Sequence, residues 1–167
     1  MITIETATVR SPVGELALYA RDSKLCGLIF EDHDERLRAH LQSRFGDDIE
    51  YVRTRDPAGA ASRLRRYLAG ELDALDDIAV DLGGTSFQAR VWAALRKIPV
   101  GATWSYATLA RKVGSPEAVR AVGAANGRNP VSLVVPCHRV IASDGGLGGY
   151  GLGLDVKRRL LDSEAPV

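Results

Sequence analysis

The segment Asn129–Gly146, NPVSLVVPCHRVIASDGG, places a cysteine between a proline and a histidine at the end of an apolar run. His138 and Arg139, which can both carry positive charge, directly follow Cys137. The thiolate is the nucleophilic form of cysteine, and a histidine base oriented by a carboxylate can generate it near neutral pH. Because proline has no backbone N–H to donate within a central sheet, we expect a buried strand to end at Pro136. The reactive thiol would then lie just past the end of that strand.

The second cysteine provides a contrast within the same chain. Cys26 lies in the apolar segment LCGLIF, where a free cysteine behaves as a small hydrophobe, so we interpret it as core. A structural role is also the common one for an isolated cysteine and remains the alternative for Cys137. Two cysteines and three histidines at no ligand-like spacing predict no disulfide framework and no metal site, and we expect no cofactor.

The elements that must position the thiol divide into two halves at Gly83-Gly84. We therefore predict one domain over residues 1–82 and another over 83–167. In the first half, period-two alternation and β-rich runs predict strands, while apolar spacing and a glycine stop predict helices. The predicted strands are 2–9, 15–20, 25–30 and 77–82, and the predicted helices are 34–46 and 57–72.

The second half is predicted to be mostly helical. Thr85 or Ser86 can cap a helix that Pro99 stops, and its apolar stripe consists of Phe87, Val91, Trp92, Leu95 and Ile98. The next helix runs from Ser105 to Gly114, and Ser115-Pro116 begins another with a cap and a first-turn proline. Two short helices joined by this tight turn are typical of a helix-turn-helix.

The distribution of charge suggests that the second half faces a polyanion. Residues 1–82 carry 11 Lys/Arg and 16 Asp/Glu, a balance of −5, whereas residues 83–167 carry 11 and 5, a balance of +6. In the helix after Pro116 one face should be core, made of Ala118, Val119, Val122 and Ala125, and the opposite face is Arg120, Gly123, Ala124 and Gly127. Such a small face suits either nucleic acid or close helix packing, and the basic half favours nucleic acid.

Five segments of the second half carry a resemblance to a known family. PCHRV at 136–140 is similar to the active-site signature of the O6-alkylguanine-DNA alkyltransferases, also called methylated-DNA–protein-cysteine methyltransferases. The surrounding matches are FQARVWAALRKIPVG, WSYATLA, RAVGAANGRNP and GGYGLGLDVKRRLL. The resemblance covers residues 85–164 well, whereas the first 80 residues are similar mainly in length and in the order of strands and helices.

The resemblance implies an α+β fold with two domains, a ribonuclease-H-like α/β domain followed by a helical, winged-helix-like DNA-binding domain. Its partner would be double-stranded DNA containing O6-alkylguanine, bound through the minor groove, with the damaged base flipped into a pocket. The alkyl group would then pass irreversibly to the cysteine in one turnover. The expected activity is DNA repair by a suicidal methylated-DNA–protein-cysteine S-methyltransferase.

The family's site residues can be carried over onto matching positions. Cys137 is implied as the acceptor, His138 as the base acting through a water, and Glu164 as the acid that orients His138. Asn129 is implied to shape the cysteine loop, and Tyr106 to promote base flipping and protonate the leaving guanine. Arg120 matches the arginine finger, and the other implied DNA contacts are Tyr106, Ala107, Ser115, Ala121, Gly123 and Ser143. The implied pocket residues are Val140, Gly148, Tyr150, Gly151 and Leu152.

Three residues depart from the family pattern without removing a group needed for chemistry. Glu117 is acidic beside the groove-facing helix side, Asn126 stands where some relatives have methionine or another apolar residue, and Leu152 interrupts a commoner pair of glycines. The related alkyltransferase-like proteins replace the cysteine, so Cys137 argues against that class.

Two other classes remain open, a DNA-damage-binding module in which Cys137 is silent and a redox or thiol-transfer enzyme without a nucleic-acid role. A transcription factor is favoured less, because the zinc-binding segment that some relatives carry in front is not seen. No run approaches the ~20 apolar residues of a membrane span, and the N-terminus lacks a signal-peptide pattern. We therefore expect a cytoplasmic protein without a membrane or obligate protein partner, monomeric when off DNA.

Overall fold

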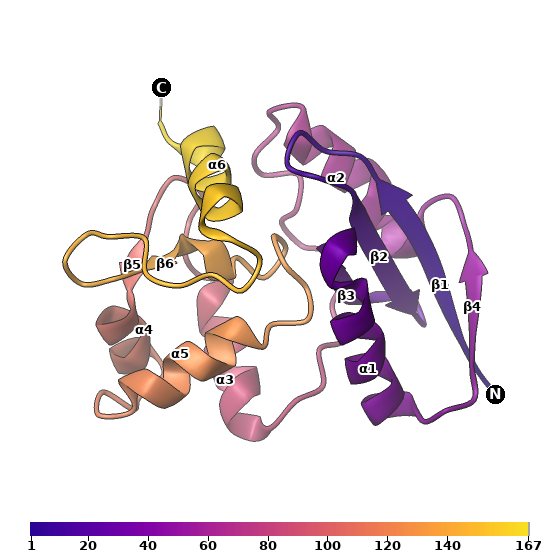
Figure 1. Cartoon of the computed structure of the whole chain (residues 1–167), viewed down its shortest axis with the longest axis horizontal. Helices are drawn as coiled ribbons and strands as arrows, with labels where there is room; N and C mark the ends of the chain where they lie inside the picture. Colours follow the sequence, from indigo (N-terminus) through magenta and orange to yellow (C-terminus); the bar gives the residue numbers. More distant parts are fainter. Residues whose placement is uncertain (167) are drawn as a thin grey trace. The chain divides into compact units, whose positions relative to one another are not determined.

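The structure is a computed structural model and describes residues 1–166, so Val167, the end of the predicted second domain, lies outside the described residues. The chain forms two compact units, Met1–Gly83 and Gly84–Val167 (Figure 1). The first combines a sheet with helices and the second is mainly helical. Among the described residues, no helix has the length and apolarity needed to cross a membrane.

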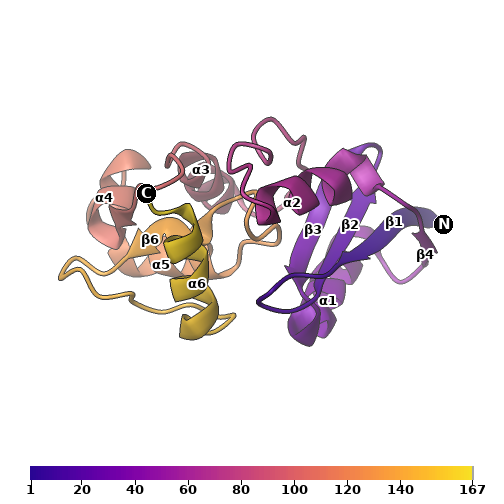
Figure 2. The ribbon, with the colours of Figure 1, turned by 90° about the horizontal axis from the view of Figure 1, so that it is seen from above.

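The first unit is built on a four-stranded sheet in the order β3-β2-β1-β4. β1 (Ile2–Val9), β2 (Leu16–Arg21) and β3 (Lys24–Phe30) pair antiparallel as a meander, and β4 (Ile49–Arg53) pairs parallel to β1. α1 (Asp34–Phe45) and α2 (Ala60–Leu68) lie on opposite faces of the sheet, as the two views of Figures 1 and 2 show. Because both faces are covered, five consecutive residues of β2 are buried.

A glycine in β3 allows α1 to pack closely on the sheet. A Cβ built on Gly27 would lie 2.8 Å from a Leu37 methyl carbon and 3.2 Å from the Tyr19 ring. Leu37 and Leu41 are the buried residues of α1, as the i, i+4 spacing predicts. Cys26, also in β3, has no exposed surface and burial raises its pKa to about 11, in agreement with its interpretation as core.

The first unit differs from the sequence-based prediction in three places. β4 was not predicted, and only three of its five residues, Tyr51 among them, are of strongly β-forming type. The segment predicted as a strand at 77–82 forms only an isolated bridge between Val80 and Leu25. The helix predicted at 57–72 begins as a single 3₁₀ turn, Pro57–Gly59, because Ala58 and Gly59 adopt left-handed backbone angles, and it ends at Leu68.

The second unit begins with α3 (Ser86–Leu95), which is capped as predicted. Thr85 accepts a hydrogen bond from the Gln88 amide at 3.1 Å, and the Gln88 side chain accepts one from the Thr85 amide at 3.0 Å. The buried Trp92 indole donates to the Ala125 carbonyl at 2.8 Å and so ties α3 to α5 (Val119–Gly127). This bond fixes the helix of the predicted helix-turn-helix relative to the core.

Three further elements complete the second unit. α4 (Tyr106–Lys112) is capped by Ser105 and precedes α5, and α6 (Leu154–Glu164) follows the glycine-rich loop. β5 (Trp104–Ser105) pairs parallel to β6 (Val140–Ile141), which directly follows the cysteine turn. This short pairing places the beginning of α4 beside the segment that carries the thiol.

Three expectations for the second unit are wrong. α5 begins at Val119 rather than at Ser115-Pro116, because residues 115–118 form a separate turn without a side-chain cap. Val119 is 37% exposed and does not belong to the core face. The buried run before Cys137 is not a strand, since it folds into turns with Leu133 at a φ of 70°.

Candidate active site

The cysteine turn is held by an asparagine that precedes it. Asn129 Nδ2 donates to the Val135 carbonyl at 2.7 Å, and Asn129 Oδ1 accepts from the Val131 amide at 2.9 Å. All three groups are buried, so these two bonds satisfy backbone groups that the turns leave without sheet partners. Asn129 therefore lies where it can shape the cysteine loop, and Cys137 opens a single 3₁₀ turn, Cys137–Arg139, with 6% of its surface exposed.

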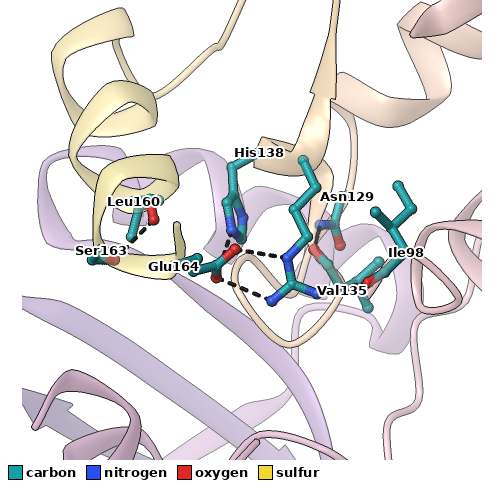
Figure 3. Close-up of polar contacts among 8 residues, drawn as sticks. Ile98, Asn129, Val135, His138, Leu160, Ser163 and Glu164 are labelled. Carbon is teal, nitrogen blue, oxygen red and sulfur yellow. Dashed lines mark hydrogen bonds and ion pairs between the residues drawn. The ribbon is translucent and has the colours of Figure 1, made fainter. Parts of the chain in front are cut away.

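A fully buried polar network lies beside this turn. His138 Nε2 lies 2.9 Å from Glu164 Oε2, and Figure 3 shows the carboxylate at the end of α6 facing the imidazole. Arg139 binds the same carboxylate with two bonds, Nε to Oε1 at 2.8 Å and Nη2 to Oε2 at 3.0 Å. Because Glu164 is ion-paired by Arg139, we treat it as a carboxylate that accepts from the imidazole.

This geometry sets the tautomer of His138. With Nε2–H donating to Glu164, the lone pair of the neutral ring is on Nδ1, which is buried and has no hydrogen bond among the described residues. Burial keeps the pKa of His138 below its usual value. Glu164 raises this pKa, and the charges of Arg139 and Lys157 lower it. A neutral imidazole with a free Nδ1 has the form that a general base needs.

The side chains that lower the pKa of Cys137 lie outside its own turn. His138 and Arg139 face Glu164. Burial raises the pKa of Cys137, and hydrogen bonds from Asn129 and Tyr150, with the charge of Lys157, act in the opposite direction. In the resting protein the thiol therefore holds its proton near neutral pH.

Lys157 is a component of the site that the sequence reasoning missed. Its ammonium has no exposed surface and donates to three carbonyls, of Val140 at 2.6 Å, Leu147 at 2.6 Å and Gly149 at 3.0 Å. Burial lowers the pKa of Lys157 to about 8, and the charge of Cys137 raises it. One signal was available, because a lysine at i and Glu164 at i+7 lie on the same helix face as buried Leu160.

The pocket residues implied by the family lie around Tyr106 and the glycine-rich loop. The Tyr106 hydroxyl donates to the Gly149 carbonyl at 3.3 Å, and a Cβ on Gly148 would lie 3.0 Å from the Tyr106 ring. Burial and the charge of Cys137 both raise the pKa of Tyr106, so its hydroxyl remains protonated near the thiol. Val140 is buried, Tyr150 and Leu152 are half-buried, and Gly148 and Gly151 are exposed.

The residues implied as DNA contacts are accessible at the surface of the second unit. Arg120, Ala121 and Ser143 are exposed, and Tyr106, Ala107, Ser115 and Gly123 are partly exposed. A Cβ on Gly123 would lie 3.8 Å from the Tyr106 ring, so α5 passes close to Tyr106. The residues predicted to contact DNA are therefore accessible at the surface, and Gly123 lies beside Tyr106.

The departure at Asn126 places a polar group next to the reactive cysteine. Asn126 is 5% exposed, its Nδ2 donates to the Cys137 carbonyl at 3.4 Å, and its Oδ1 is buried without a hydrogen bond among the described residues. Residues 1–166 contain no group of three metal-ligating side chains. The arrangement is suited to a nucleophilic thiol with a histidine base.

Comparison with known proteins identifies the family over nearly the whole chain. The description "6-O-methylguanine DNA methyltransferase, ribonuclease-like domain" matches residues 4–82, and "6-O-methylguanine DNA methyltransferase, DNA binding domain" matches residues 86–166. A methylated-DNA–protein-cysteine methyltransferase of Mycolicibacterium paratuberculosis is 48% identical over 164 residues, covering 96% of this chain and 92% of that protein. One from Shigella flexneri is 39% identical, covering 98% and 97%.

Solved structures agree with the family match and with the two-domain α+β fold. The O6-methylguanine methyltransferase of Mycobacterium tuberculosis superposes with a TM-score of 0.79 at 42% identity, covering 100% of this chain and 96% of that one. The Mycobacterium tuberculosis OGT in complex with DNA gives a TM-score of 0.79 at 41% identity, with 99% and 96% covered. The chain therefore belongs to the 6-O-methylguanine DNA methyltransferase family, with an N-terminal ribonuclease-like domain and a C-terminal DNA-binding domain.

Proposed function

We propose that this protein repairs DNA by transferring the alkyl group of O6-alkylguanine to the sulfur of Cys137. The observation that carries the proposal is the neutral, buried Cys137 beside a histidine whose Nε2 is bound to Glu164 and whose Nδ1 is free. Adjacent side chains usually point in different directions, so the proton passes from the thiol to His138 through a water. Support comes from the methyltransferase names of relatives that are 39–48% identical over nearly the full chain.

The reaction balances without a cofactor. The carbon–sulfur bond forms as the carbon–O6 bond breaks, and both electrons of the broken bond remain on guanine. The thiol proton moves to His138, and the guanine anion takes a proton that Tyr106 supplies from its neutral hydroxyl. The proton held on His138 then returns through water to the Tyr106 phenolate, so the products are a thioether on Cys137 and restored guanine, with His138 and Tyr106 in their starting forms. Because a thioether has no easy route back to a thiol, each chain acts once.

DNA binding is assigned to the second domain, residues 83–167, and structural support to residues 1–82. We infer that α5 enters the minor groove with its small face, that Arg120 fills the space of the flipped base, and that Ser143 and Ser115 contact the backbone. The basic balance of residues 83–167 and the DNA complex of the Mycobacterium tuberculosis relative support this assignment. We infer a cytoplasmic protein that is monomeric when off DNA and has no obligate protein partner.

Mass spectrometry after incubation with duplex DNA containing O6-methylguanine tests the proposal. One methyl group should replace the thiol hydrogen on the peptide bearing Cys137, and titration against excess substrate should stop at one methyl per chain. Cys137→Ser should abolish transfer, and Cys26→Ser, the matched control in the core of the other domain, should leave it unchanged.

The competing classes predict different spectra. A damage-binding module would bind the methylated duplex with an unmodified Cys137, and a thiol-transfer enzyme would react with disulfides independently of DNA. Sustained turnover beyond one equivalent would contradict the irreversible thioether.

A further inference from the structure

All three side-chain nitrogens of Arg139 donate hydrogen bonds within the second unit. Its side chain is 9% exposed, and it donates to both oxygens of Glu164 and, through Nη1, to the Ile98 carbonyl at 2.9 Å. Ile98 lies just after α3, and Glu164 is the last residue of α6. The planar guanidinium therefore fixes both the position and the plane of the carboxylate that His138 uses.

One carboxylate oxygen serves both basic residues. Glu164 Oε2 accepts from Arg139 Nη2 at 3.0 Å and lies 2.9 Å from His138 Nε2. The two bonds from the planar guanidinium fix the plane of the Glu164 carboxylate. In that plane Oε2 faces Nε2 of His138.

The charges of the network explain why the base stays unprotonated. Arg139 and Glu164 carry opposite charges, so the buried group of three is neutral when His138 is neutral. If Arg139 were absent, the same three positions would be neutral only after taking up a proton on His138 or Glu164. Because a net charge inside the protein is costly, the presence of Arg139 decides how readily the pair is protonated.

We propose that Arg139 is a positioning residue of the transfer reaction, which holds Glu164 against His138 and leaves the imidazole free to accept the proton of Cys137. The inference rests on the proposed function and adds a residue to it. Arg139 touches neither the sulfur nor the substrate, and it acts through Glu164.

The other charged groups that face His138 do not replace this effect. Glu164 and Lys157 face it from α6, and Cys137 and Arg139 come from its own turn. Lys157 is held by three backbone carbonyls and has no carboxylate partner among the described residues, so its charge remains when Arg139 is removed. Arg139 is the cation that is bonded to Glu164.

The test is the pH profile of single-turnover transfer from free O6-benzylguanine, followed from about pH 8 downward, since an ordinary histidine titrates near pH 6.5 and burial lowers the pKa of His138 below that value. Free O6-benzylguanine is used because DNA binding then does not contribute. Arg139→Met should lower the plateau of the transfer rate. It should also move the acid limb of the profile to a pH roughly one unit higher, because the charge of Glu164, no longer neutralised, would raise the pKa of His138. Arg139→Lys keeps the positive charge but cannot form both hydrogen bonds to Glu164. Its plateau rate should therefore fall, while the acid limb of its profile should stay at the pH of wild type. Arg158→Met, an exposed position on α6, is the control and should overlay wild type.

A second pair of variants measures the same charge if Arg139→Met fails to fold. Glu164→Gln leaves Arg139 uncompensated beside His138, so its acid limb should lie below that of Arg139→Met/Glu164→Gln, in which both charges are gone. Equal limbs in each comparison would reduce Arg139 to a packing residue. A wild-type profile without an acid limb, with His138→Gln reacting at the wild-type rate, would instead remove the histidine base from the proposed function.

Discussion

Replacement of Lys157 by methionine keeps a long side chain on α6 and removes its charge and its three hydrogen bonds. The ammonium joins Val140, next to the cysteine turn, to Leu147 and Gly149 of the glycine-rich loop. It is also among the groups that lower the pKa of Cys137. The variant should therefore lose stability and, to a larger degree, transfer activity.

The two losses can be estimated separately. The Val140 carbonyl is buried, whereas the loop carbonyls can turn toward water, so one unsatisfied group should cost about 1–3 kcal/mol of unfolding free energy. For a domain of this size that lowers Tm by at least about 4 °C. A displacement of about 1 Å in the loop that borders the thiol should slow transfer about 100-fold, before any loss of thiolate stabilisation is added.

The assay is single-turnover transfer from a methylated duplex and from free O6-benzylguanine at a temperature well below the lower Tm. Both substrates should be slowed to a similar degree, because Lys157 acts at the thiol and the loop rather than at the DNA surface. Arg158→Met, at the adjacent exposed position, serves as the matched control. A Lys157→Met protein with a lowered Tm and the wild-type transfer rate would refute the reasoning and leave Lys157 a structural residue.

Four further predictions follow from single positions. Arg120→Ala should slow repair of duplex DNA strongly and leave reaction with O6-benzylguanine nearly intact, since the exposed side chain lies outside the thiol network; equal loss on both would mean a structural role. Because the pKa of buried His138 lies below its unfolded value, the unfolded chain binds more protons, so the unfolding free energy should fall as pH drops below about 6.5, at up to about 1.4 kcal/mol per unit, and His138→Gln should flatten this slope in urea titrations. Gly84→Ala should lower Tm, because φ is +82° and the new Cβ would lie 2.6 Å from the Trp92 ring; an unchanged Tm would contradict this packing. Leu152→Gly should speed the benzyl reaction roughly 5- to 150-fold and leave methyl transfer nearly unchanged, and equal benzyl rates would show that Leu152 does not restrict the pocket.

The elements that the sequence predicts well are those with a local signal. β1 carries period-two alternation, β2 and β3 are short apolar runs, and α3 carries both a capping box and an apolar stripe, so each can be located from a few neighbouring residues. β4 and the segment 77–82 have weaker signals. Which of the two becomes a strand of the sheet depends on β1, whose edge pairs with β4. That pairing joins residues nearly 50 positions apart, so no run of neighbouring residues predicts it.

The site shows the same division between local and distant information. Cys137 and His138 stand out because they follow an apolar run, but the direction of the His138 side chain is set by Glu164, which comes from α6. The buried run before Cys137 looks like a strand by composition and folds as turns because Asn129 satisfies its backbone. Lys157 was missed because a lysine in an amphipathic helix normally lies in water, and only the arrival of three carbonyls makes its burial favourable.

If each chain acts once, as the proposed reaction requires, a thiol that is unreactive at rest is an advantage. Burial raises the pKa of Cys137 and lowers that of His138, so both favour the pair of neutral thiol and neutral imidazole over the ion pair. A protonated thiol is a poor target for oxidants and stray electrophiles, which react with the thiolate. The thiol should therefore lose its proton to His138 only when an alkylated guanine is present. The sulfur then bonds to the alkyl carbon, and the negative charge passes to the departing guanine. In the role proposed for it, Arg139 contributes to this control, because by neutralising Glu164 it limits how far the carboxylate raises the pKa of His138.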